Sequence, residues 1–214
     1  MFVNNDMKVR IVKTSSFLKK QYCELAFGGV WKDSFGLPER NSRWLIYGKS
    51  GEGKTEFSVQ LAKYLSGFGK VLYVSREQGD SSSLQQCFAR NAMQEAGNKV
   101  LLGVGMNFKD LLHVLKKRTK HAAVVIDSID YMRLTADEYK QLDQLCKKTV
   151  LVFVSWSDNR RPKSSAGKDI EYMCDVKIYV DRYVVMPRSR YGGNAPYVIW
   201  EDGAKRHHGW MNRV

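Results

Sequence analysis

A glycine-rich octapeptide carries the clearest chemical signal in this sequence. It matches the pattern G-x-x-x-x-G-K-S/T at every fixed position and reads Gly48-Lys49-Ser50-Gly51-Glu52-Gly53-Lys54-Thr55. Glycines let such a loop turn its backbone N–H groups toward phosphate oxygens. Lys54 would then reach the β- and γ-phosphates of a nucleoside triphosphate, and the Thr55 hydroxyl would coordinate Mg²⁺. The octapeptide and the next residue, Glu56, are therefore predicted to bind a nucleotide.

The segments on either side of this loop are the elements that must position it. Residues 43–47 are mostly apolar and favour a strand. The following segment carries Phe57, Leu61 and Tyr64 at helical spacing. Phosphate binding requires a strand, a glycine loop and a helix in this order, because the helix N-terminus adds partial positive charge.

Two acidic residues follow short apolar runs further along the chain. Asp127 ends the run at 122–126, where a P-loop protein is expected to carry the acid that holds Mg²⁺ through water, beside Thr55. A helix N-cap is the alternative interpretation of Asp127. Because Ser128 follows it, rather than a glutamate, the water-activating base is sought on the neighbouring strand, where Glu77 is the candidate. A solvated loop acid is the alternative interpretation of Glu77.

The remaining apolar segments alternate between strand and helix patterns. Strands are expected at 70–75, 99–104, 122–127 and 149–156, and helices at 81–94, 108–120 and 137–147. This alternation predicts an α/β fold with a mostly parallel central sheet and helices on both faces. C-terminal antiparallel hairpin strands are expected at 176–180, 183–186 and 197–200, and the polar segment 157–168 is expected to lack regular structure. We expect a lead-in segment at 1–39 and a single core at 40–214.

Charge and composition limit the classes of function. The formal net charge is +13, from 35 Lys and Arg against 22 Asp and Glu, and it favours an anionic partner such as nucleic acid. A general surplus for solubility is the alternative. No apolar run reaches the roughly 18 residues of a membrane span, and the N-terminus lacks the apolar stretch of a signal peptide. The four cysteines form no zinc pattern, so free thiols and a cytoplasmic location are expected.

The segments that carry Glu77 and Asp127 resemble those of a known class of ATPases. Val71-Leu72-Tyr73-Val74-Ser75-Arg76-Glu77 and Val124-Val125-Ile126-Asp127-Ser128-Ile129 are similar to segments of the RecA/RadA/DnaB/KaiC class. In that class the catalytic Glu follows the second core strand, and Asp-Ser ends the Mg²⁺-binding strand. The resemblance implies a RecA-like P-loop NTPase fold, ATP and Mg²⁺ as cofactors, and ATP hydrolysis with Glu77 and Lys54 as catalytic residues.

Further segments extend the resemblance toward the C-terminus. Met186-Pro187-Arg188-Ser189-Arg190-Tyr191-Gly192-Gly193 resembles the Lys-x-Arg-Phe-Gly element of bacterial RadA, with Arg188 in place of the usual lysine. In those relatives the basic pair reaches the neighbouring subunit's γ-phosphate, which implies a homo-oligomer with Arg188 and Arg190 as catalytic residues. Residues 155–157 occupy the position of the strand end that, in the family, often carries a polar residue in contact with the γ-phosphate. The segment 158–168 takes the place of the DNA-binding loop, which implies single-stranded DNA binding by Arg160, Arg161, Lys163 and Lys168.

The resemblance spans residues 40–200 and implies a role in DNA recombination. A bare core of this size resembles the phage Sak-type single-strand annealing proteins, so annealing or strand exchange is expected. A KaiC-like regulatory ATPase with a protein partner and a DnaB-type helicase motor are the alternatives. Two aromatic residues, Trp156 and Tyr172, flank the basic loop and could stack on bases. Packing is the first expectation for Trp156, with stacking as its alternative, and Tyr172 is open between packing and stacking.

Overall fold

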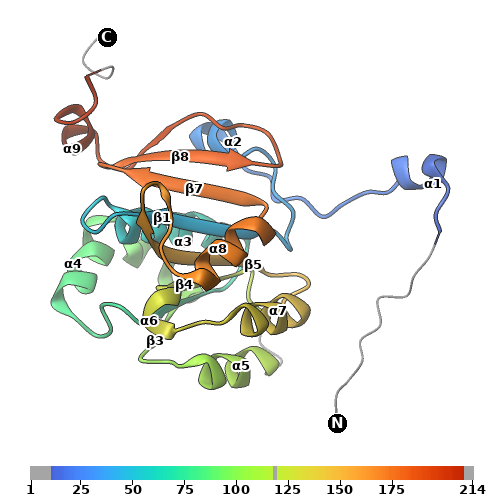
Figure 1. Cartoon of the computed structure of the whole chain (residues 1–214), viewed down its shortest axis with the longest axis horizontal. Coiled ribbons are helices and arrows are strands. Elements are labelled where there is room, and N and C mark those ends of the chain that lie inside the picture. The colour runs from blue at the N-terminus through green and yellow to red at the C-terminus, as the bar shows by residue number, and fades with distance from the viewer. Residues whose placement is uncertain (1–10, 118–119, 210–214) are drawn as a thin grey trace.

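A single mixed sheet organises the protein, whose computed structural model describes residues 11–117 and 120–209 (Figure 1). Within these residues the strand order is β3-β2-β4-β5-β1-β7-β8-β9, with β6 paired to β5. From β3 to β7 in this order, neighbouring strands are parallel. β8 pairs antiparallel with β7, and β9 pairs antiparallel with β8. The predicted α/β fold with C-terminal antiparallel strands is therefore confirmed. The strand bounds are β1 (Arg43–Gly48), β2 (Val71–Ser75), β3 (Val100–Val104), β4 (Ala123–Asp127), β5 (Val150–Asp158), β6 (Arg161–Pro162), β7 (Val176–Asp181), β8 (Val184–Ser189) and β9 (Tyr197–Val198).

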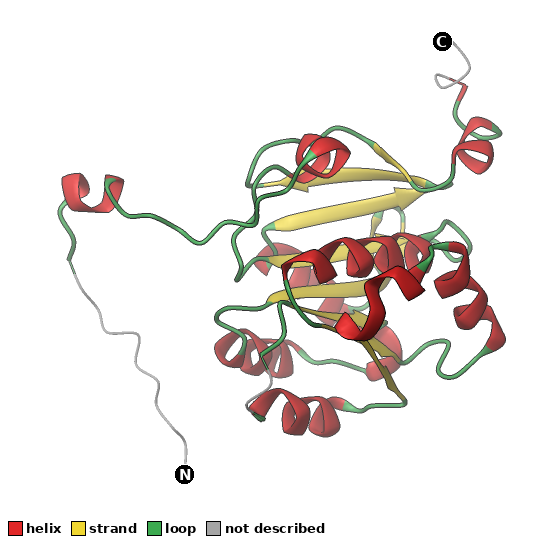
Figure 2. Cartoon of the chain, turned by 180° about the vertical axis from the view of Figure 1, so that it is seen from behind, coloured by secondary structure: helices red, strands yellow, loops and turns green. Residues whose placement is uncertain are grey.

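Helices cover both faces of the sheet, as Figure 2 shows from behind. The apolar sides of α3 (Lys54–Leu65) and α4 (Ser82–Arg90) pack in the core of one face. The core of the other face contains apolar residues of α5 (Phe108–Lys116), α7 (Ala136–Leu145) and α8 (Ser165–Met173). Among the described residues, no helix combines the length and the apolar character needed to cross a bilayer. The shorter helices are α1 (Thr14–Leu18), α2 (Gly29–Phe35), α6 (Ile129–Met132) and α9 (Glu201–Lys205), with 3₁₀ turns η1 (Ser66–Phe68) and η2 (Met93–Lys99).

The central strands explain why the candidate residues come together. β1, β2 and β4 are buried along their whole length, because helices on both faces exclude water from parallel strands. Parallel strands end at the same edge of a sheet. The glycine loop after β1, Glu77 after β2 and Asp127 at the end of β4 therefore meet at one edge.

The N-terminal part of the described chain divides into a packed and a projecting segment. In α2, Trp31 and Phe35 pack against Phe57 of α3, with ring centroids 6.1 and 6.0 Å from it. In contrast, α1 buries none of its residues and stands away from the body (Figure 1). Its Phe17 and Leu18 are 54% and 77% exposed.

The polar segment predicted to be irregular contains regular structure. β5 continues to Asp158, a turn passes through Asn159 and Arg160, and β6 returns antiparallel to β5. Both turn residues have positive φ, 47° and 61°, which suits the twist of a two-residue hairpin. The Ser164 hydroxyl then accepts a hydrogen bond from the Gly167 N–H and caps α8. The prediction was wrong because so short a hairpin has almost no strand pattern of its own. We call residues 158–163 the basic hairpin.

Candidate nucleotide-binding site

The glycine loop adopts a conformation that few other residues could follow. Gly51 and Gly53 have φ of 79° and 100°, in the left-handed region. A Cβ on Gly48 would lie 2.5 Å from the carbonyl oxygen of Val180 on β7. The loop therefore depends on glycine both for its curvature and for its close contact with the neighbouring strand. Lys49 and Ser50, which lie between Gly48 and Gly51, are exposed, as expected of a loop whose backbone binds the ligand.

Lys54 begins α3 and lies almost buried, at 8% exposure. Its Nζ donates a hydrogen bond to the carbonyl oxygen of Lys49 at 2.7 Å, so the ammonium group lies across its own loop. Burial lowers the pKa of Lys54, and the carboxylates of Glu77 and Asp127 act in the opposite direction. A phosphate group beside this ammonium would favour its charged form and relieve the cost of burying it.

Asp127 lies beside Thr55, as the sequence predicted. Its side chain is 2% exposed, and Oδ2 accepts a hydrogen bond from the Tyr73 hydroxyl at 2.7 Å. That hydroxyl is 2.8 Å from Ser58 Oγ on α3. Burial raises the pKa of Asp127 to about 6, against the hydrogen bonds from Tyr73 and Thr55. Tyr73 was not singled out in the sequence, where it belongs to an ordinary apolar strand.

The hydroxyl of Thr55 and the carboxylate of Asp127 are suitable ligands for Mg²⁺. No group of three or more His, Cys, Asp or Glu side chains that could hold a metal occurs within the described ranges. A P-loop site does not need one, because Mg²⁺ takes one or two protein oxygens and completes its octahedron with phosphates and water. The donor set at this edge of the sheet therefore fits the ion.

Asp127 leads to a stability prediction for the nucleotide-free protein. The pKa of its carboxyl rises from 3.8 to about 6 on folding. A carboxyl whose pKa is higher in the folded state contributes its full stabilisation at pH values below its pKa in the unfolded chain. That contribution is lost as the pH rises through about 6. We expect Asp127→Asn to increase the Tm at pH 8 by at least about 4 °C and to flatten the loss of stability between about pH 4 and 6. A Tm below that of the wild type at pH 8, measured by calorimetry, would contradict this.

Glu77 is held by Trp156, which lies on β5 two residues before the basic hairpin begins. The exposed side chain of Glu77 lines the pocket at the glycine loop, and Oε2 accepts a hydrogen bond from Trp156 Nε1 at 3.2 Å. The backbone N–H of Trp156 donates to Asp130 Oδ2 at 2.8 Å, and its ring meets Tyr131 edge-on at 5.3 Å. The sequence favoured packing for Trp156, with stacking on bases as the alternative. It also connects the end of β5 to Glu77.

The side chains of Glu52 and Glu56 have partners in the protein. Glu52 accepts hydrogen bonds from the backbone N–H groups of Arg182, through its carboxylate, and Tyr183, through its carbonyl. It therefore fastens the glycine loop to the turn between β7 and β8. Burial favours a raised pKa for Glu56, but hydrogen bonds from Arg90 and its neighbours lower the pKa below its usual value. The part of these two residues that remains for a nucleotide is the backbone.

The pocket at the loop continues into a second hollow. The first has a volume of about 230 Å³ and is lined by Lys54, Thr55 and Glu77 among others. The second, about 560 Å³, reaches Trp200. Both are lined by Glu56, Arg90 and Tyr183. Of these, Arg90 and Tyr183 come from distant parts of the sequence and were not predicted. A larger hollow of about 680 Å³ lies beyond Gln60 at the other end of α3 and does not contact the loop.

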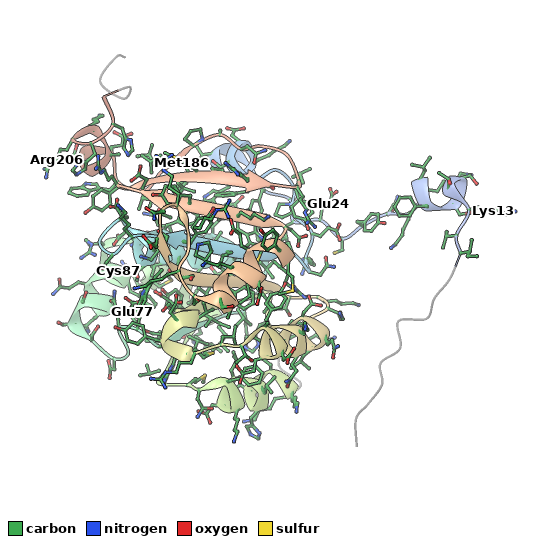
Figure 3. All side chains as sticks on the ribbon, in the orientation of Figure 1. Lys13, Glu24, Glu77, Cys87, Met186 and Arg206 are labelled. Carbon is green, nitrogen blue, oxygen red and sulfur yellow. The ribbon has the colours of Figure 1, made fainter. Side chains whose placement is uncertain are left out.

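The predicted intersubunit and DNA-binding residues lie outside this pocket. Arg188 lies near the end of β8 and does not line the pocket that Glu77 lines. The labels of Met186, also on β8, and of Glu77 stand apart in Figure 3. Arg190 pairs with Asp175 at 3.3 Å. Arg160, Arg161 and Lys163 lie on the basic hairpin, and Lys168 is exposed on α8. The four DNA-binding candidates are thus gathered on the hairpin and the helix that follows it.

Comparisons with known proteins identify the fold. No protein-family model and no curated protein sequence matches the chain. Among solved structures 684 chains are similar, so the fold is common and does not select one function. One of these structures is described as an ATPase domain; it is 13% identical, has a TM-score of 0.52, and the match covers 72% of this chain and 78% of that one. The protein thus has a RecA-like P-loop NTPase fold.

Proposed function

We propose that this protein is an ATP-hydrolysing recombination protein that binds single-stranded DNA and promotes its annealing or strand exchange. The hydrogen bond between Trp156 and Glu77 carries the proposal. It joins the candidate catalytic carboxylate to the strand that leads into the basic hairpin, so a change at the hairpin alters the position of the carboxylate. Such a connection suits an ATPase that responds to DNA.

The chemistry follows from the residues at the sheet edge. Backbone N–H groups of the glycine loop and Lys54 bind the β- and γ-phosphates, while Thr55 and Asp127 hold Mg²⁺. Glu77 orients and deprotonates the attacking water. Arg188 and Arg190 of a neighbouring copy stabilise the negative charge on the γ-phosphoryl group as it passes from ADP to water. The adenine base of ATP occupies the hollow beside Trp200.

A self-assembling oligomer is supported by two exposed apolar surfaces. β3 is an edge strand, and its Leu101, Leu102 and Val104 are 40–46% exposed. The projecting segment exposes Phe17 and Leu18. Edge strands and unpartnered apolar residues are prone to pair with other chains, so the projecting segment of one copy is proposed to pack on β3 of the next.

The assembly is tested by light scattering after gel filtration, with ATP and single-stranded DNA present. We expect the double variant Phe17→Ser with Leu18→Ser to elute as a monomer while the wild type assembles. Val30→Ser is the matched control, because Val30 is 60% exposed on α2 and belongs to neither surface. Equal masses for the double variant and the wild type would refute this arrangement.

Trp156→Phe tests the connection between the two sites. The phenyl ring keeps most of the packing against Tyr131 but removes the N–H whose hydrogen bond Glu77 accepts. We expect kcat for ATP to fall about 3- to 10-fold, as for the loss of one hydrogen bond, with the Kd for ATP within about twofold. Stimulation by DNA should shrink as well. If the variant hydrolyses ATP with wild-type kcat and stimulation, Trp156 has only a packing role.

The proposed function itself is tested by ATP hydrolysis with and without single-stranded DNA. Stimulation, together with annealing of complementary strands, is the expected result. ATP hydrolysis with no effect of DNA and no retention of DNA at low salt would favour the regulatory ATPase. Unwinding of a forked duplex without annealing would favour the helicase motor.

A further inference from the structure

A second hollow lies beside the basic hairpin, away from the glycine loop. Its volume is about 410 Å³, which is within the range of small-ligand pockets, about 300–1,000 Å³. The hairpin and α8 form its walls, and side chains of β1, β7 and β8 form its floor. We call it the α8 hollow.

The floor of the α8 hollow follows from the register of β7 and β8. Lys177 pairs with Arg188, and Tyr179 with Met186, so these four side chains point to the same face of the sheet. Lys177, Tyr179 and Met186 are half-buried and Arg188 is exposed, whereas the alternate residues of β7 on the opposite face are buried. This part of the sheet is therefore covered only in part, and its open face is cationic and aromatic.

The charge of the hollow suits an anion. Arg160, Arg161, Lys177 and Arg188 line it, against the single carboxylate of Glu171. The guanidinium of Arg160 lies 5.5 Å from the centre of the Tyr179 ring, a distance typical of a cation–π contact. The cations are thus spread over both wall and floor, as phosphate groups spaced along a chain require.

Tyr172 supplies the aromatic side of the hollow. It is 75% exposed on α8, although an aromatic side chain of this size gains most from packing against a core. Of the two roles expected for Tyr172, packing and stacking on bases, the folded chain therefore does not use it for packing. A solvated aromatic ring beside several cations is the combination that binds unpaired bases, because every base presents a flat face for stacking while cations follow the backbone.

We propose that the α8 hollow binds one unpaired nucleotide of single-stranded DNA. Its base stacks on Tyr172, and Arg160 and Lys177 bind the flanking phosphates. This inference rests on the proposed function, since it specifies where the DNA strand leaves the basic hairpin. It adds Tyr172 and Lys177, which have no role in the proposed nucleotide site.

The test measures the Kd for a fluorescent oligothymidylate and for a duplex of equal length, with the full chain. Tyr172→Ala should weaken single-strand binding about 5- to 100-fold, as for the loss of one stacked base, and leave duplex binding within about twofold. Tyr172→Phe keeps the stacking surface and should bind like the wild type. Lys177→Ala should reduce the slope of log Kd against log salt concentration by the amount expected for the loss of about one phosphate contact.

Photocrosslinking gives a readout that does not depend on a variant. An oligonucleotide containing 5-iodouracil should crosslink to Tyr172 of the wild-type protein, as located by mass spectrometry. Wild-type affinity of Tyr172→Ala for single strands, or equal weakening for duplex, would overturn the inference. If replacing Arg160, Arg161 and Lys163 by Ala abolishes DNA binding while Tyr172→Ala does not weaken it, the α8 hollow fails and the proposed function stands. If the wild type itself binds no DNA, the proposed function fails.

Discussion

Lys54→Ala is expected to lower ATP hydrolysis by at least about 100-fold, as for the loss of one charge that stabilises the transition state. The Lys54 ammonium is the buried cation at the start of α3 and donates to the loop carbonyl of Lys49 at 2.7 Å. It can therefore exchange that carbonyl for phosphate oxygens without breaking a contact to a distant part of the fold. The measurement is phosphate release at saturating ATP and Mg²⁺.

The same substitution is not expected to unfold the protein. Burial lowers the pKa of Lys54, which means that the fold bears a cost for keeping this charge, and removing the charge removes the cost. Lys63→Ala is the matched control, because Lys63 lies on the same helix but bonds to Asn91 and Glu95 at its far end. Full hydrolysis by Lys54→Ala, or an equal loss in Lys63→Ala, would contradict the assignment of the loop.

Replacement of Arg160, Arg161 and Lys163 by Ala is expected to weaken binding of single-stranded DNA by at least about 100-fold at low salt, because most of the affinity comes from phosphate contacts. The slope of log Kd against log salt should fall by about 2 units, from the loss of three contacts. ATP binding should be unchanged, since the three side chains do not line the pocket at the glycine loop.

A charge-matched variant separates a local contact from general attraction. Replacement of Lys140, Lys147 and Lys148 by Ala removes the same amount of charge from exposed positions on α7 and after it. It should weaken DNA binding only slightly. If both triple variants lose affinity equally, the net charge of +13 attracts DNA without a specific surface, and the hairpin has no special role.

The glycine loop and the order of elements along the chain were predictable because their signals are local. Gly51 and Gly53 indicate backbone in the left-handed region, which favours glycine. The apolar runs at β1, β2 and β4 indicate strands that are covered on both faces. The meeting of Glu77 and Asp127 at one edge follows from parallel strands alone. The basic hairpin was missed, because two positive-φ residues, Asn159 and Arg160, make a turn without a glycine.

The sequence by itself determined the phosphate-binding loop, the parallel sheet and the edge at which the candidate catalytic residues meet, since each depends on a contiguous segment or on a simple rule of strand direction. Only the tertiary structure decided which side chains contact them. Trp156 reaches Glu77 from a different strand, Glu52 binds the β7–β8 turn, and Tyr172 lines the α8 hollow rather than the core. Such contacts depend on the register and packing of segments far apart in the chain, which no local pattern records.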